Sequence, residues 1–268
     1  DYGRYSWFEN IGSDNYKTHI IDELYTALGS RNIKLVDLDL DGDLDILGSS
    51  KDSYNNPNQS FLGAYVWYEN VGSGKFQTHI INDKYKFARN ADVFVVEDFD
   101  NDDDLDIIGT LDSKDNTLVY FQNDGFNNFT PELLFENSEI SERIQFISAK
   151  DINKDGKMDI LVSSTNINQY YYLENQGEGV FSTTTLKNPN VSDFNSAQVS
   201  VIKSGDIEGD GDIDIIAFNS KDQNIGFYRN SNSEFGDYEK IIDIPNTARH
   251  FDIVDVDQDE DMDILIAY

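Results

Sequence analysis

The chain contains no cysteine. This absence excludes disulfide bonds, zinc sites built from thiolates and cysteine nucleophiles together. Proline is scarce, at 4 of 268 residues, and no apolar run approaches the ~18 residues of a membrane span. No N-terminal stretch resembles a signal peptide, so the sequence is expected to be a mature or trimmed segment, or a cytosolic protein.

Positive charge is also in short supply. Twenty basic residues stand against 51 acidic ones, for a formal net charge of −31. Nucleic acid and anionic membranes are therefore poor partners. Strong acidity is also typical of disordered chains, but 38% hydrophobic and 13% aromatic residues indicate a folded one.

What the sequence does contain is one acidic loop of nine residues, repeated five times. The copies are called loops 1 to 5: residues 37–45, 98–106, 151–159, 206–214 and 255–263. Their starts lie 61, 53, 55 and 49 residues apart, and a hydrophobic pair or triplet follows each loop. A repeat period of about 50 residues is typical of arrays or propellers and overrides the length-based domain count.

Each repeat carries four short β-strand signals. One precedes the loop, one follows it, the third is aromatic and ends in asparagine, and a Gly/Asn turn leads to the fourth. The first strands are predicted at 33–36, 93–96, 144–148, 199–202 and 251–254. Four antiparallel strands per repeat indicate an all-β fold, a β-propeller whose blades cover about 31–81, 91–135, 144–187 and 199–243.

The chain ends supply the fifth blade of this prediction. Residues 2–21 hold only third and fourth strands, with Trp7-Phe8-Glu9-Asn10 as the aromatic one, whereas residues 249–268 hold only first and second strands. Together they complete one blade, so a single five-bladed domain over 1–268 would close by joining the termini. Closure would remove open sheet edges. The competing interpretation is a fragment of a longer array.

The spacing within each loop matches calcium ligation. Calcium takes 6–8 oxygen ligands, and alternate residues of a tight loop point inward. Positions 1, 3 and 5 would offer side-chain oxygens, position 7 its carbonyl, and position 9 would close the shell, with glycine at position 6 for the turn. The predicted ligands are Asp37, Asp39, Asp41, Asp45; Asp98, Asp100, Asp102, Asp106; Asp151, Asn153, Asp155, Asp159; Asp206, Glu208, Asp210, Asp214; and Asp255, Asp257, Asp259, Asp263.

The five loops fit this pattern to different degrees. Loop 1 matches fully, and loop 3 matches with Asn153 in place of one carboxylate. In loop 4 the longer Glu208 must fold back. Loops 2 and 5 have Asp103 and Glu260 at the glycine position, so loop 5 is the least regular site. We expect up to five structural calcium ions, with no catalytic role because the protein saturates each shell.

The acidic loops and the aromatic strands that end in asparagine resemble FG-GAP (VCBS-type) repeats over essentially the whole chain. These repeats form the blades of integrin alpha-chain propellers, which have seven blades, and of many secreted bacterial proteins. The resemblance implies calcium and recognition at the cell surface or outside the cell, including adhesion. It implies no single activity.

The resemblance implies a ligand site on the face opposite the calcium loops. Four of the six arginines, Arg31, Arg89, Arg143 and Arg249, just precede a first strand. Arginine binds carboxylate or sulfate bidentately, which favours an acidic or sulfated polysaccharide. The same arginines can instead pair with neighbouring acids and join adjacent blades. The polar insertion 49–62, with Tyr54, lies on the same predicted face.

Besides carbohydrate binding, two other functions stay open, a polysaccharide lyase and an adhesion or spacer domain. His250 follows Arg249, and a His/Tyr/Arg set is what a polysaccharide lyase acting on a uronic-acid polymer needs. No Gly-x-Ser-x-Gly elbow or phosphate loop supports other chemistry. The third possibility is a protein-adhesion domain or rigid spacer. The chain is predicted to be monomeric.

Overall fold

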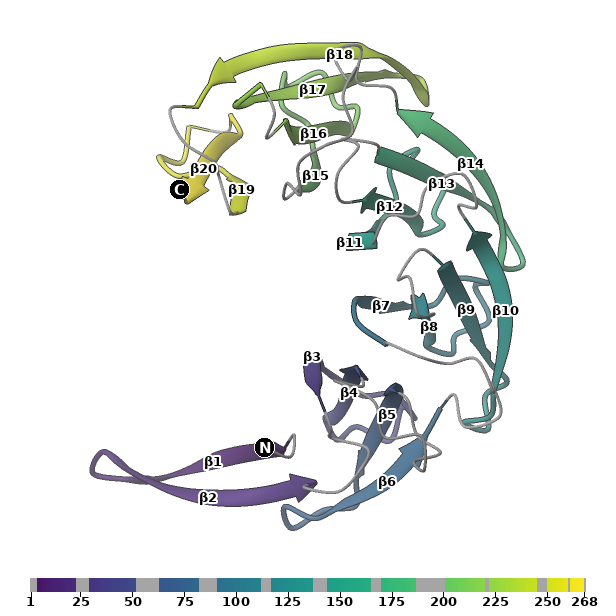
Figure 1. Ribbon diagram of the computed structural model, residues 1–268, viewed down its shortest axis with the longest axis vertical. Helices are drawn as coiled ribbons and strands as arrows, with labels where there is room; N and C mark the ends of the chain where they lie inside the picture. The colour runs from purple at the N-terminus through teal and green to yellow at the C-terminus, as the bar shows by residue number, and fades with distance from the viewer. Residues whose placement is uncertain are drawn as a thin grey trace. The chain divides into compact units, whose positions relative to one another are not determined.

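The structure is a computed structural model. It describes residues 4–22, 29–51, 63–81, 91–111, 117–136, 144–164, 170–186, 201–219, 222–244, 250–259 and 261–267. All regular elements in these ranges are β-strands, as the sequence predicts, and Figure 1 shows them in chain order. No helix that could cross a membrane is found in this part of the chain.

Four antiparallel sheets of four strands each form the repeating units. The first two are β3 (Ser30–Val36), β4 (Asp45–Lys51), β5 (Gly63–Asn70), β6 (Phe76–Ile80) and β7 (Phe94–Glu97), β8 (Asp106–Leu111), β9 (Thr117–Asn123), β10 (Phe129–Glu136). The next two are β11 (Ile144–Lys150), β12 (Asp159–Ser164), β13 (Tyr170–Gly177), β14 (Val180–Leu186) and β15 (Ile202–Gly205), β16 (Asp214–Asn219), β17 (Asn224–Ser231), β18 (Glu234–Asp243). Each sheet is ordered as the chain runs, which is the predicted blade unit.

The chain ends form two sheets of only two strands. They are β1 (Tyr5–Gly12) with β2 (Asn15–Asp22), and β19 (His250–Val254) with β20 (Asp263–Ala267). Their sequences correspond to strands three and four and to strands one and two of a blade. The two half-blades are confirmed, whereas their union into one sheet stays a prediction.

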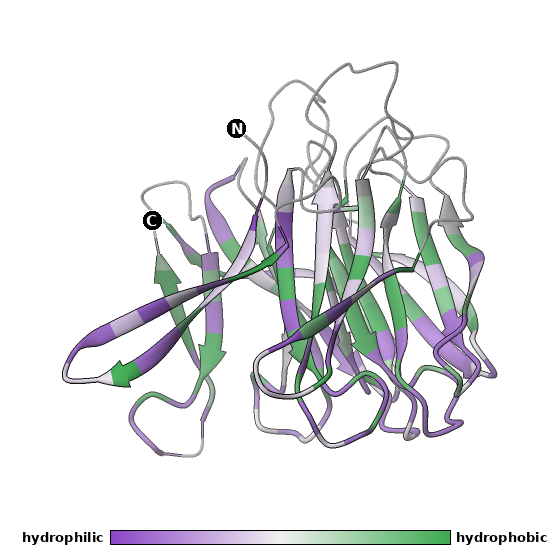
Figure 2. Cartoon of the chain, turned by 90° about the horizontal axis from the view of Figure 1, so that it is seen from below, coloured by the Kyte–Doolittle hydropathy of each residue, from purple (hydrophilic) through white to green (hydrophobic). Residues whose placement is uncertain are grey.

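Burial within a sheet follows the order of its strands. Every residue of β8 and of β12 is buried, because second strands are covered on both faces. The outer strand β14 is mostly exposed. Figure 2 shows hydrophobic residues concentrated in the strands and hydrophilic residues in many of the connections. The hydrophobic pair after each acidic loop is therefore the start of a core strand.

Tyrosines at the start of third strands reach the next sheet along the chain. Their hydroxyl groups donate to carbonyl oxygens of second strands: Tyr5 to Ser49 (2.6 Å), Tyr65 to Thr110 (2.8 Å) and Tyr170 to Phe218 (2.9 Å). A Cβ atom at Gly48 or Gly109 would collide with the rings of Tyr5 and Tyr65. Glycine is thus required where a neighbouring ring packs onto the backbone.

The contacts divide the chain into two compact units. One consists of residues 1–96 and 102–139, and the other of residues 97–101 and 140–268. Apart from Glu97 at the end of β7, each contains two four-stranded sheets and one two-stranded sheet. The predicted single domain over 1–268 and the closed five-bladed ring therefore remain predictions.

One strand lies later than predicted. The first strand of the fourth unit was expected at 199–202, but β15 covers Ile202–Gly205 and residues 199–200 lie outside the described part. Strand β15 pairs Gly205 with Asp214, so it runs directly into loop 4. The apolar pattern misplaced the strand because the loop, not the hydrophobic run, fixes its end.

Candidate metal centres and ligand pocket

Each acidic loop joins the first strand of its sheet to the second. Position 4 has a left-handed backbone in all five loops, at Leu40, Asn101, Lys154, Gly209 and Gln258. The positive φ of Leu40 is not predictable from its residue type, because a leucine rarely adopts this conformation. The shared backbone conformation shows that the five loops follow one design.

The glycine position behaves as expected. Gly42, Gly156 and Gly211 have φ of +97°, +86° and +93°. Asp103, which replaces glycine in loop 2, also has positive φ, at 72°. An aspartate tolerates this region better than most residues. Glu260, at the same position of loop 5, lies outside the described residues.

Backbone N–H groups orient the loop carboxylates. In all five loops the amide at position 7 donates to the carboxylate at position 5, over 2.8–3.0 Å. In loops 1, 3 and 4 the glycine amide donates to the carboxylate at position 1, over 2.8–3.0 Å. The loops therefore hold their carboxylates in place with bonds of their own.

In the four complete sheets, the aspartate at position 9 is buried and links its loop to the third strand as a strut. Asp45 accepts hydrogen bonds from Leu38 N (3.2 Å), Trp67 Nε1 (2.9 Å) and Asn70 N (2.7 Å). In the other complete sheets, the backbone N–H of the strand-three asparagine likewise donates to the aspartate at position 9, which is Asp106, Asp159 or Asp214. From the loop spacing alone, position 9 is predicted only as a metal ligand. Its first role in the structure is to tie the loop to the third strand.

Three loops gather their carboxylates into compact clusters. One oxygen from each member lies within 4.8 Å of the others in the sets Asp37–Asp39–Asp41, Asp98–Asp100–Asp106 and Asp255–Asp257–Asp259. Loop 5, the least regular loop in sequence, is among them.

Loop 1 shows the fit to a cation most clearly. Asp37 Oδ1 is buried and accepts no hydrogen bond. Burial and the nearby charge of Asp45 raise the pKa of Asp39. Within the described residues, no cation pairs with Asp37, Asp39 or Asp41. A bound cation would satisfy the orphaned oxygen and offset the repulsion.

In loops 3 and 4 a basic side chain forms an ion pair with a loop carboxylate. In loop 3, Lys157 Nζ lies 2.6 Å from Asp155 Oδ2. In loop 4, the Arg229 guanidinium on β17 forms an ion pair with Glu208 and lies 3.7 Å from Glu239. Asn153 donates to Glu174 at 3.1 Å. These two loops thus carry part of their own counter-charge.

The expected ligand face falls largely outside the described residues. Arg89, Arg143, Arg249 and Tyr54 all lie there. Arg31 on β3 and His250 on β19 are described, and both are exposed. The arginine cluster and the lyase set therefore stay predictions.

The other two histidines occupy equivalent places on fourth strands. The ring of His19 stacks on Trp7 and that of His79 on Trp67, with centroids 4.2 and 4.4 Å apart. Each histidine also bonds a strand-three glutamate, at 2.8 and 2.7 Å. This repetition indicates a structural role for both histidines.

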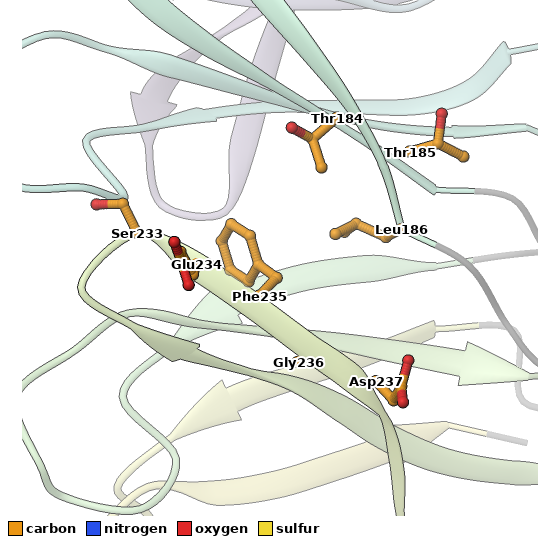
Figure 3. Close-up of a pocket in the computed structure, with 8 residues that line it drawn as sticks. All are labelled: Thr184, Thr185, Leu186, Ser233, Glu234, Phe235, Gly236 and Asp237. Carbon is orange, nitrogen blue, oxygen red and sulfur yellow. The ribbon is translucent and has the colours of Figure 1, made fainter.

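Sequence reasoning missed a pocket between two neighbouring sheets of the second unit. It has a volume of about 450 Å³ and lies between the outer strand β14 and the β17–β18 hairpin. Its lining includes Thr184, Thr185, Leu186, Glu234, Phe235 and Asp237. Figure 3 shows Leu186 directed from β14 toward the Phe235 ring on β18. The pocket residues lie on or next to the outer strands β14 and β18, outside the acidic loops from which the sites were predicted.

The chain is similar to known proteins in sequence and in fold. The family model described as FG-GAP-like repeat matches residues 98–162, 151–217 and 206–266, which together span more than half of the chain. No curated protein sequence matches. A solved lectin from Agrocybe aegerita, described by its specific recognition of non-reducing terminal N-acetylglucosamine, shares the fold with a TM-score of 0.64. The match has 17% identity and covers 97% of this chain and 67% of the lectin.

Proposed function

Because the chain belongs to the FG-GAP-like repeat family, we propose that it is a calcium-stabilised extracellular module that binds carbohydrate. The observation that carries the carbohydrate assignment is the fold match to the Agrocybe aegerita lectin, which extends over 97% of the chain. A polar pocket of ligand size in the same fold supports it.

Calcium is the cation that fits the acidic loops. Their donors are carboxylate, amide and carbonyl oxygens, which a hard cation prefers, and the sequence has no cysteine for a softer metal. The clusters in loops 1, 2 and 5 place three carboxylates within reach of one ion. The buried, unbonded Asp37 Oδ1 is a ligand atom that such an ion would satisfy.

The five sites are expected to differ in affinity. Loops 1, 2 and 5 would bind calcium tightly, whereas Lys157 and Arg229 compete with the ion in loops 3 and 4. This distribution predicts three tight sites and two weak ones within the upper limit of five.

Replacing Arg229 tests this distribution. The sheet β7–β10 has Gln122 at the corresponding place before its strand-three asparagine, so Arg229→Gln is a substitution that the repeat already contains. It should strengthen calcium binding at loop 4 by about tenfold or more, because it removes a like charge close to the ion. Calorimetric titration with calcium should then resolve a fourth tight site. The control Lys240→Gln removes a charge on β18 that is paired with Asp243, and it should not produce a fourth tight site. An unchanged titration for Arg229→Gln would contradict the competition between Arg229 and the ion.

A closed ring of five blades is part of the proposal. The two-stranded sheets β19–β20 and β1–β2 would form one blade between them. Trp7 Nε1 is buried without a partner, whereas the equivalent Trp67 donates to Asp45. Asp263 is the counterpart of Asp45, and pairing it with Trp7 would repeat the strut of the complete sheets. Apolar side chains that a complete blade would cover, Phe8 and Leu265, are 63% and 59% exposed.

Affinity electrophoresis tests the carbohydrate assignment. Gels cast with neutral, acidic or sulfated polysaccharides, with calcium present, should retard the protein for at least one polymer. Each polymer is then checked for chain cleavage, since cleavage of a uronic-acid polymer would select the lyase centred on His250. Absence of retardation by every polymer would overturn carbohydrate binding and leave protein adhesion or a spacer role.

A further inference from the structure

The pocket on β14 and β18 has a backbone feature absent from the corresponding part of two other sheets. Tyr228 pairs with Tyr238 and Asn230 with Phe235, so Gly236 and Asp237 together stand opposite the single residue Arg229. This is a β-bulge. The equivalent stretches of β5–β6 and β13–β14 pair one residue to one. Bulges redirect side chains next to functional sites, and this one lies in the pocket wall.

The apolar floor of the pocket is held in a fixed orientation. The Phe235 ring packs edge-on against Tyr172, with centroids 5.1 Å apart. The Tyr172 hydroxyl in turn donates to the buried Asp159 at 3.0 Å. Leu186, from β14, is buried beside them. A ligand would therefore meet a flat apolar surface that is already in place, which lowers the entropic cost of binding.

The rim of the pocket offers hydrogen-bond acceptors and hydroxyl groups. Glu234 and Asp237 are exposed, and neither has an ion-pair partner among the residues that the structure describes. Thr184, Thr185 and Ser233 add hydroxyl groups, which donate or accept. An apolar floor with such a rim complements a pyranose ring, which has an apolar C–H face and hydroxyl groups around its edge.

The geometry points to this pocket as a binding site for a pyranose without negative charge, and this inference rests on the proposed carbohydrate-binding function. Two carboxylates and no basic residue occur among the described lining residues, in a chain with a net charge of −31. A uronate or sulfated sugar would be repelled there, whereas neutral hydroxyl groups donate to carboxylates in strong hydrogen bonds. The pocket thus selects against the acidic polymers that the arginines favour.

Saturation-transfer NMR titrations with N-acetylglucosamine and with glucuronic acid test the site. We expect N-acetylglucosamine to bind and glucuronic acid to bind at least about tenfold more weakly. Asp237→Asn should weaken N-acetylglucosamine binding by about tenfold or more, because it removes a charged acceptor. Glu234→Gln provides a second variant on the opposite side of Phe235. Asp243→Asn, the same charge change at the end of β18, is the matched control and should bind like the parent.

The outcomes separate the pocket from the proposed function. Retardation in polysaccharide gels that is unaffected by Asp237→Asn and Glu234→Gln would overturn the pocket and leave carbohydrate binding intact. Equal or tighter binding of glucuronic acid would overturn the charge selection. Absence of binding to every sugar and polymer would overturn both.

Discussion

Addition of a calcium chelator is expected to lower the midpoint of thermal unfolding by about 5–10 °C for each tightly occupied loop. An ion at 100 times its dissociation constant stabilises the folded state by about 2.7 kcal/mol, and 1 kcal/mol shifts the midpoint of a chain of this size by about 2–4 °C. Without the ion, burial and then the nearby charge of Asp45 raise the pKa of Asp39, so its charged form is disfavoured in loop 1. Differential scanning calorimetry with calcium and with chelator measures the shift.

A matched pair of variants in loop 1 identifies the source of this shift. Asp39→Asn removes a cluster carboxylate and should reduce the difference between calcium and chelator. Asp43→Asn makes the same charge change at position 7, where only the carbonyl is a predicted ligand, and should leave the difference unchanged. Equal effects of the two variants would show that net charge, and not ligation, governs stability. If the chelator leaves the midpoint of thermal unfolding unchanged, the calcium assignment is wrong.

A disulfide between the two chain ends is the second large expected effect. If β20 and β1 pair as β4 and β5 do, Ile266 faces Ser6 just as Gly48 faces Val66. The double variant Ser6→Cys/Ile266→Cys should then oxidise within one chain, because directly opposed strand residues have Cα separations that suit a disulfide. The crosslink should stabilise the fold by roughly 4–5 kcal/mol, since it closes a very long loop.

Because the chain contains no cysteine, the two introduced thiols are the only ones that can form a disulfide. Non-reducing electrophoresis and thiol titration report the crosslink, and thermal unfolding reports its effect on stability. The control pair Ser6→Cys/Leu265→Cys moves one residue along β20, so its side chain points to the other face of the strand. Equal oxidation of both pairs, or only intermolecular dimers from the first, would contradict ring closure in the predicted register.

The repeat and the four-strand sheets could be predicted from the sequence because their signals are local and repeated. A nine-residue loop with acids at alternate positions, followed by Ile-Leu or Ile-Ile, marks the turn and the core strand at once. The left-handed backbone at Asp103 was also predictable from the pattern of the other loops. The positive φ of Leu40 was not, because the geometry shared by the five loops overrides the preference of leucine.

The roles of Asp45, Arg229 and the pocket depend on contacts between distant segments. Asp45 meets Trp67 and Asn70 across the sheet, so spacing within loop 1 could not separate a strut from a ligand. Arg229 reaches Glu208 from the third strand, and the pocket arises where β14 passes the bulge at Gly236. Local patterns predict elements, whereas these features follow from how elements pack.

A crystal structure of the calcium-loaded protein, with the ions identified by anomalous scattering, tests the central claim most directly. At calcium just above stoichiometric concentration, we predict ions in loops 1, 2 and 5, and a closed five-bladed ring in which Trp7 donates to Asp263. Loops free of ions, or half-blades that do not meet, would contradict the account of a calcium-stabilised propeller.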